Sequence, residues 1–260
     1  RVLAGMNFKE VKMIDGGGNK RPYGDRTPTT TRGNITDIIC IGFNPKDESC
    51  PAENTLVSFV ASTSRNNLNN SINPTSGNKL KLGTEQFVSV GESSPTFNRM
   101  RASYSYYIPA KLINLTKGCQ SSEAAGEDCP QTIALQLKAG TIVGELPPYE
   151  AFCLGGTSSV RGWGSCELGV SKSFVEGTIE HRFPIWRMLS GALFVDAGSD
   201  LGTQNDVPGE PGKLLQKSGS GYSLGGGVGV KTPIGPLRLD IASQDLSGDW
   251  RYTLGVGWKF

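Results

Sequence analysis

The sequence predicts an all-β fold, an antiparallel transmembrane β-barrel with about ten strands. Three observations support this prediction. Apolar residues alternate with polar or small residues along many segments, which is the period of a two-faced strand. The second face is charged in one strand and glycine-lined in the next, which suits a wide, wet interior better than the outside of a soluble sandwich. Short and long connections alternate, as periplasmic turns and outer loops do in membrane barrels.

The strands are expected at regular intervals along the chain. Their predicted ranges are 1–13, 54–64, 78–90, 97–109, 131–144, 174–184, 190–200, 221–231, 236–242 and 250–260. In the segment FVEGTIEHRFP, Val175 and Ile179 share the apolar face, whereas Glu180 and Arg182 share the inward one. In PLRLDIA, Asp240 is on the inward face. Together the segments make about ten strands, of a length suited to crossing an outer membrane at a tilt.

The alternation is clearest in the segment WRYTLGVGWKF. One parity is apolar throughout: Tyr252, Leu254, Val256, Trp258 and Phe260. The other is polar or small: Arg251, Thr253, Gly255, Gly257 and Lys259. This pattern predicts one continuous strand over 250–260.

The connections 15–53, 147–173 and 201–218 are long and polar, whereas the turn Pro233–Pro236 is short. The connection that holds Cys119 and Cys129 breaks this alternation, because it is fairly long and falls on the short-turn side.

Composition excludes several classes of protein. The 26 Lys and Arg nearly balance the 24 Asp and Glu, which argues against nucleic-acid binding. A helical membrane span needs roughly 20 apolar residues, and no run approaches that length. The chain begins at Arg1 without an initiator Met or an apolar signal segment, so it is expected to be a processed or truncated piece.

The six cysteines fall into three local couples: Cys40 with Cys50, Cys119 with Cys129, and Cys153 with Cys166. No C-x-x-C spacing occurs, so a metal site is not expected. Three loop-stapling disulfides in an oxidising compartment are favoured over free thiols. Sequence alone does not fix the pairing.

Nothing in the sequence indicates an enzyme or a bound cofactor. The glycine run from Gly225 to Gly229 lacks the spacing and the following helix of a phosphate loop, and is expected to form a smooth inner wall or a bend. The only histidine, His181, falls on the outward parity of its strand. No G-x-S-x-G motif and no catalytic acid pair is present.

Three motifs occur in order: VRGW at Val160–Trp163, FVDAG at Phe194–Gly198, and the closing GVGWKF. Together they resemble the outer-membrane assembly-factor superfamily (BamA-like, bacterial surface antigen family), in its cyanobacterial or plastid type. The resemblance runs from about Asn73 to Phe260. It implies that residues 1–260 are the last ten strands of a sixteen-strand barrel, without the first strands and the N-terminal POTRA modules.

The resemblance also implies a role for Arg161 in the loop at 147–173, hereafter the VRGW loop. In the family this loop folds back into the barrel, where its arginine meets acids on the two following strands. Here the partners would be Asp196 of the F-x-D-x-G motif and Glu180. A guanidinium withdrawn from water needs such partners and can bond a carboxylate with two N–H groups. The alternative is a solvated loop charge. The motif residues are Val160, Arg161, Gly162 and Trp163, then Phe194, Asp196 and Gly198.

Two features depart from the family. Trp163 stands where Phe or Tyr is usual, and the couple of Cys153 and Cys166 suggests an extra staple at the base of the loop. The chain end fits the signature that assembly machines read in outer-membrane proteins, through Thr253, Gly255, Trp258 and Phe260. That signature identifies a client of such a machine, and porins share it.

The function implied by the resemblance is insertion and folding of β-barrel clients by lateral opening of the seam between the first and last strands. The location implied is the outer membrane of a bacterium of cyanobacterial type, with the plastid outer envelope as the alternative. The partners implied are unfolded outer-membrane proteins and outer-membrane lipid, with lipopolysaccharide and periplasmic chaperones as further candidates. A two-partner-secretion or envelope translocation channel and a passive porin are the competing interpretations.

Overall fold

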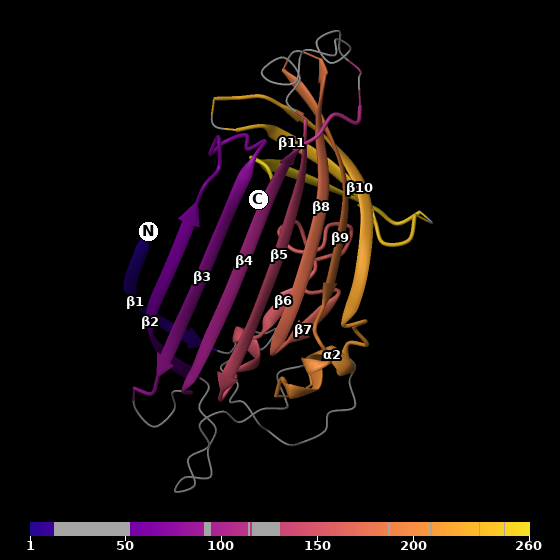
Figure 1. Cartoon of the computed structure of the whole chain (residues 1–260). Coiled ribbons are helices and arrows are strands. Elements are labelled where there is room, and N and C mark those ends of the chain that lie inside the picture. Colours follow the sequence, from indigo (N-terminus) through magenta and orange to yellow (C-terminus); the bar gives the residue numbers. More distant parts are fainter. Residues whose placement is uncertain are drawn as a thin grey trace, which may run out of the picture.

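The structure is a computed structural model, and it describes residues 1–12, 53–90, 95–113, 115, 131–186, 188–208, 210–233, 235–246 and 248–260. Ten strands form one antiparallel sheet in the order β1-β2-β3-β4-β5-β8-β9-β10-β11-β12. Figure 1 shows them side by side in a tilted, curved wall. The predicted all-β antiparallel architecture is confirmed.

The ten wall strands follow the predicted segments closely. Their bounds are β1 Val2–Lys12, β2 Glu53–Asn66, β3 Gly77–Val88, β4 Phe97–Pro109, β5 Thr132–Gly144, β8 Ser173–Trp186, β9 Leu189–Ser199, β10 Ser220–Val230, β11 Leu237–Ser243 and β12 Trp250–Val256. The VRGW loop connects β5 and β8, and contains the turn η2 (Pro148–Glu150) and a separate hairpin of β6 (Phe152–Leu154) and β7 (Gly169–Ser171). The connection after β9 holds the short helices η3 (Thr203–Asp206) and α2 (Pro211–Leu214).

The two faces of the wall differ as the alternation predicts. On β8, Ile179 is 57% exposed on the outer face, whereas Glu180 on the concave face is fully buried. On β10, Tyr222 is 57% exposed and Ser223 is fully buried. The outer face therefore presents large apolar side chains, and the concave face carries polar and charged ones.

The concave face differs from the expected wide, wet interior where the VRGW loop lies against it. An apolar cluster joins the base of the loop to strands β2 to β5, and it consists of Leu56, Phe87, Phe97, Ile142, Leu146 and Phe152, with Val207 from the β9–β10 connection. The described part of the interior is therefore packed around this loop.

The prediction of a continuous strand over 250–260 is wrong at its end. Strand β12 stops at Val256, and Gly257 takes a φ of +84°, which turns the chain out of the strand direction. Trp258 then donates its indole N–H to Asn73 Oδ1 at 2.9 Å, and the Arg182 guanidinium lies 4.5 Å from the Trp258 ring and 5.1 Å from the Phe260 ring. These contacts hold both aromatic side chains on the concave side instead of the outer face.

Among the described residues, no helix is both long enough and apolar enough to span a membrane.

Candidate functional site

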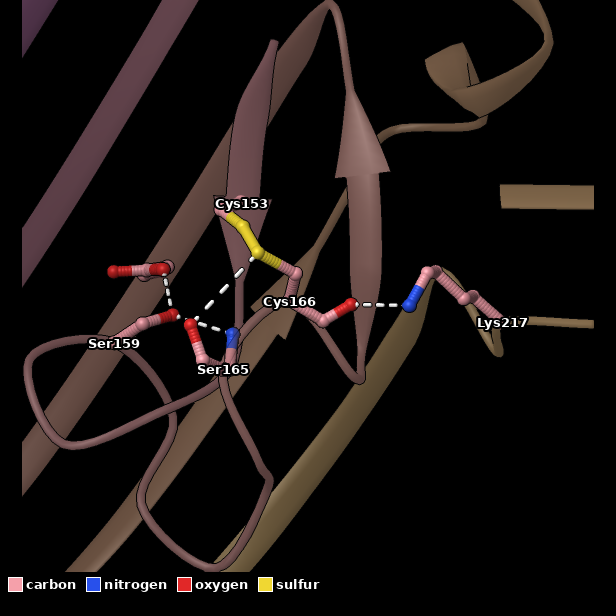
Figure 2. Close-up of a disulfide and its surroundings, with 7 residues drawn as sticks. Cys153, Ser159, Ser165, Cys166 and Lys217 are labelled. Carbon is pink, nitrogen blue, oxygen red and sulfur yellow. Dashed lines mark hydrogen bonds between the residues drawn. A yellow bond between two sulfur atoms is a disulfide. The ribbon is translucent and has the colours of Figure 1, made fainter. Parts of the chain in front are cut away.

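The base of the VRGW loop is closed by a disulfide between Cys153 and Cys166, whose Cα atoms lie 4.6 Å apart. Figure 2 shows this bridge, with Lys217 donating from Nζ to the carbonyl of Cys166 at 2.6 Å. Cys153 belongs to β6, so the bridge ties the hairpin to the segment that follows the loop tip. This one of the three expected staples is present.

The other two expected staples involve cysteines outside the described residues. Cys50 and its expected partner Cys40 lie outside the described residues, so the disulfide predicted for Cys50 is not confirmed. Cys119 and Cys129 also lie outside the described residues. Both pairings therefore stay predictions from the sequence.

The tip of the loop makes a tight turn against the wall. Gly162 has a φ of +88°, and a Cβ placed there would lie 3.1 Å from the Cβ of Ser223 and 3.3 Å from the backbone of Ser243. Any side chain at this position would therefore be strained and would push the tip away from β10 and β11. The glycine of the VRGW motif allows its neighbour, Arg161, to reach the wall.

Arg161 is 1% exposed and binds two carboxylates that the sequence indicated. Its Nε donates to Asp196 Oδ2 at 2.8 Å and its Nη2 donates to Asp196 Oδ1 at 3.1 Å, so the ion pair is bidentate. The backbone N–H of Arg161 also donates to Asp196 Oδ2, at 3.1 Å. Its Nη1 donates to Glu180 Oε2 at 2.8 Å. The structure thus brings Arg161, Asp196 and Glu180 together.

A third carboxylate, Asp240 on β11, accepts from Arg161 Nη1 at 3.1 Å. The alternation in PLRLDIA predicts that Asp240 lies on the inward face of its strand but does not connect it to Arg161. Three strands of the wall, β8, β9 and β11, therefore each supply one acid to a single guanidinium.

Each of the three acids also has a second cation. Lys259 Nζ lies 3.1 Å from Asp196 Oδ2, and Arg182 Nε donates to Glu180 Oε1 at 2.7 Å. Arg238 Nε lies 3.0 Å from Asp240 Oδ2 without hydrogen-bond alignment. Lys259 is a further member of the site that the family motifs do not indicate, although its inward parity was the available signal.

The remaining motif residues pack around this cluster. Val160 is fully buried, and its Cγ2 would lie 2.9 Å from a Cβ at Gly198, so the glycine of F-x-D-x-G leaves room for it. The Phe194 ring lies under the guanidinium of Arg161, 3.3 Å from ring centre to Cζ. Trp163 donates its indole N–H to the carbonyl of Tyr222 at 3.0 Å.

The surroundings keep Arg161 charged. Burial alone would lower the pKa of Arg161, but the hydrogen bonds to Asp196 and the negative charges of Glu180 and Asp240 outweigh burial and raise the pKa above its usual value. The guanidinium is therefore a permanent cation in this site.

Comparison with known proteins identifies the family. The family description that matches is "Omp85 superfamily domain", over residues 1–260. The chain belongs to the Omp85 superfamily. The resemblance drawn from the three motifs is thus confirmed.

Plant relatives of this Omp85 chain include two Arabidopsis thaliana proteins. Outer envelope protein 80, chloroplastic, is 42% identical over 128 residues, which is 49% of this chain and 17% of the relative. Protein TOC75-4, chloroplastic, is 33% identical over 184 residues, which is 71% of this chain and 43% of the relative. The chain thus spans less than half the length of these relatives.

A solved structure shows the same fold. It is the crystal structure of BamA from Haemophilus ducreyi lacking POTRA domains 1-3, with a TM-score of 0.60 and 15% identity, and the match covers 97% of this chain and 49% of that one. The family and these relatives together support a location in a bacterial outer membrane or a plastid outer envelope. The POTRA modules and first strands that the resemblance implies upstream stay a prediction.

In the Omp85 chain, the glycines of β10 leave space for the arginine site. A Cβ at Gly227 would lie 2.1 Å from Asp240 Oδ1, and one at Gly225 would lie 2.4 Å from Cζ of the Phe194 ring. The expected smooth inner wall therefore lacks side chains at the two places where partners of Arg161 need the space.

Between the VRGW loop and β12 lies a cavity of about 400 Å³, lined on one side by Arg161 and Trp163 and on the other by Arg251 and Thr253. Of the predicted terminal signature, Thr253 lines this cavity, whereas Trp258 and Phe260 lie beyond the end of β12. Within the described ranges, no group of His, Cys, Asp and Glu is arranged to hold a metal ion. The chemistry of the site is electrostatic docking of a loop onto a wall.

Proposed function

We propose that the protein containing this chain inserts and folds β-barrel proteins in an outer membrane. The observation that carries the proposal is the full burial of Arg161 against acids from β8, β9 and β11, in a chain of the Omp85 superfamily. The loop acts as a fixed internal support, and the protein works without a catalytic residue, a cofactor or a nucleotide.

The edge of the sheet at β12 is the proposed place where a client strand pairs. Among the described strands, β12 pairs with β11 alone, through a register from Ser243↔Trp250 to Leu237↔Val256. A strand with one unpaired edge offers a row of N–H and C=O groups to another strand. Unpaired backbone groups are costly in lipid, so a client strand that bonds to this edge gains stability there.

The cavity between the VRGW loop and β12 supports this assignment. It borders β12 at Arg251 and Thr253, where an exposed ion pair between Arg251 and Glu167, at 2.9 Å, joins the strand to the loop. An exposed ion pair costs little to break, so this strand can shift more easily than the buried tip. The loop tip, by contrast, is fixed to β8, β9 and β11. Motion during insertion is therefore expected within Trp250–Val256 of β12, whereas the tip and the residues after β12, where Lys259 lies 3.1 Å from Asp196, stay in place.

The proposed partners are unfolded outer-membrane proteins and the surrounding lipid, and lipopolysaccharide and periplasmic chaperones are further candidates. A translocation channel would use the same scaffold for export or import of a soluble partner. A passive porin fits less well, because the packed VRGW loop occupies the concave side.

The test uses the full-length protein in liposomes with a urea-unfolded porin as client. Insertion is measured as the heat-modifiable, protease-protected porin. The expected result is faster insertion than in empty liposomes. Insertion no faster than in empty liposomes, together with transport of a soluble protein or solute-selective conductance, would replace this proposal by translocation or by a porin.

A further inference from the structure

The VRGW loop has a second charged contact, at its base and separate from that of Arg161. Glu150, the last residue of η2, is 6% exposed. Its Oε2 accepts from Arg99 Nη1 at 2.8 Å, and Lys9 donates to its other carboxylate oxygen. Arg99 is on β4 and Lys9 is on β1. The base of the loop is therefore bound to strands that lie before β5 in the sheet order, whereas its tip is bound to strands that lie after β5.

Arg99 is held in place by the wall itself. Its Nη2 donates to Glu85 Oε2 at 2.7 Å, and Glu85 Oε1 accepts from the Ser58 hydroxyl at 2.8 Å. The guanidinium lies 5.2 Å from the centre of the Phe87 ring. These contacts from β2 and β3 orient the fork of Arg99 before the loop arrives, which reduces the entropy lost when Glu150 binds.

Apolar packing shields this pair from water. Phe152, two residues after Glu150, packs edge-on against Phe174 with ring centres 4.7 Å apart, and Arg101 lies 5.3 Å from its ring centre. Leu146 is 3% exposed in the same cluster. A charge pair in such surroundings interacts more strongly than an exposed one, and loss of one partner leaves the other buried.

The chain between the two contacts is short and closed. Arg161 follows Glu150 by eleven positions, and a free segment of that length spans up to roughly 36–40 Å when extended. The disulfide between Cys153 and Cys166 closes a ring that begins three residues after Glu150, so the tip is tethered to Glu150 along both arms of the ring. A fixed Glu150 therefore restricts the positions that the tip can reach.

We infer that the VRGW loop is a strut held at both ends, and that Glu150 is a positioning residue that holds Arg161 over its three acids. Glu150 binds cations on β1 and β4, whereas Arg161 binds acids on β8, β9 and β11. The loop thereby links two parts of the wall that share no direct strand pairing. This inference rests on the proposed function for its link to activity, and on geometry for the positioning itself.

The experiment compares Glu150→Gln in the full-length protein with Glu210→Gln, a matched control in an exposed ion pair with Lys213. Hydrogen exchange is measured over residues 155–164, and heat-modifiability reports the folded barrel. The expected result for Glu150→Gln is a rise of about tenfold in tip exchange, the change that a shift of about 1.4 kcal/mol in docking produces. The control is expected to leave tip exchange unchanged.

Arg99→Lys is the second variant, because it keeps the charge and loses the fork that serves Glu150 and Glu85 together. The hydrogen-exchange rate of its tip is expected to lie between the rate of the wild-type protein and the rate of Glu150→Gln. Faster exchange confined to residues 148–152, with the tip equal to the control, would overturn the inference. Loss of the folded barrel in both variants would also overturn it, because the pair would then hold the wall instead of positioning the tip.

Porin insertion in liposomes separates this inference from the proposed function. A wild-type protein that inserts no porin would refute the proposed function, whereas the exchange result would still decide the positioning role. If wild type inserts porin, Glu150→Gln is expected to slow insertion and Glu210→Gln is not.

Discussion

Replacement of Arg161 by alanine removes the residue on which the docked tip depends. The guanidinium donates to Asp196 twice, to Glu180 once and to Asp240 once, all at 2.8–3.1 Å. Alanine removes these hydrogen bonds and the contact with the Phe194 ring. We expect the tip to leave the wall and the strands to stay paired, because the wall ladders do not include the tip.

The loss in docking free energy depends on the second cation that each acid keeps after Arg161 is replaced. Removal of one partner from a buried ion pair costs about 3–5 kcal/mol when the other is left uncompensated. Here Asp196 keeps Lys259 and Glu180 keeps Arg182, so the effect is expected near 3 kcal/mol, at the low end of that range. This shifts the docking equilibrium by roughly 100-fold.

Hydrogen exchange over residues 155–164 and porin insertion in liposomes are the assays, with heat-modifiability as the check on folding. Arg161→Lys is the matched control, because an ammonium keeps the charge but lacks the planar fork that bonds a carboxylate with two N–H groups. We expect it to fall between wild type and Arg161→Ala. If Arg161→Ala shows the same tip exchange and the same porin insertion as the wild-type protein, the reasoning is refuted and apolar contacts alone hold the tip.

Two further predictions concern the surroundings of the tip. Serine at both Cys153 and Cys166 is expected to destabilise the docked loop by about 3 kcal/mol, as chain entropy gives for a loop near this length, and limited proteolysis of the loop measures it. Gly227→Ala is expected to speed tip exchange, because its Cβ would lie 2.1 Å from Asp240 Oδ1. Gly226→Ala is the control, since its Cβ meets nothing closer than 3.4 Å. Equal exchange in the two alanine variants would contradict the role of Gly227.

The sequence predicts the faces of the strands well, because alternation is a local property that each strand carries by itself. It places Glu180, Asp196 and Asp240 on one side of the wall. It does not show that Asp240 joins Arg161, since that contact depends on strand order, register and the path of the loop over a separation of 79 residues. The family motifs supply the link to Asp196 and Glu180 but leave Asp240 out.

The end of β12 shows where local pattern fails. The alternation continues without interruption to Phe260, yet the strand ends at Val256. The positive φ of Gly257 and the cation at Arg182 redirect the chain, and neither is visible from the period of the pattern. The base contact of Glu150 was missed for a similar reason, because a lone acid in a polar loop has no periodic signal.

The three acids of the arginine site lie 19, 35 and 79 residues beyond Arg161 along the chain. Contacts with such separations are expected to form late in folding, after the strands that carry them have paired. The loop is synthesised before any of these strands, so its tip cannot dock until they are in place. Arg161 can therefore make all three contacts only when the wall has been assembled as far as β11.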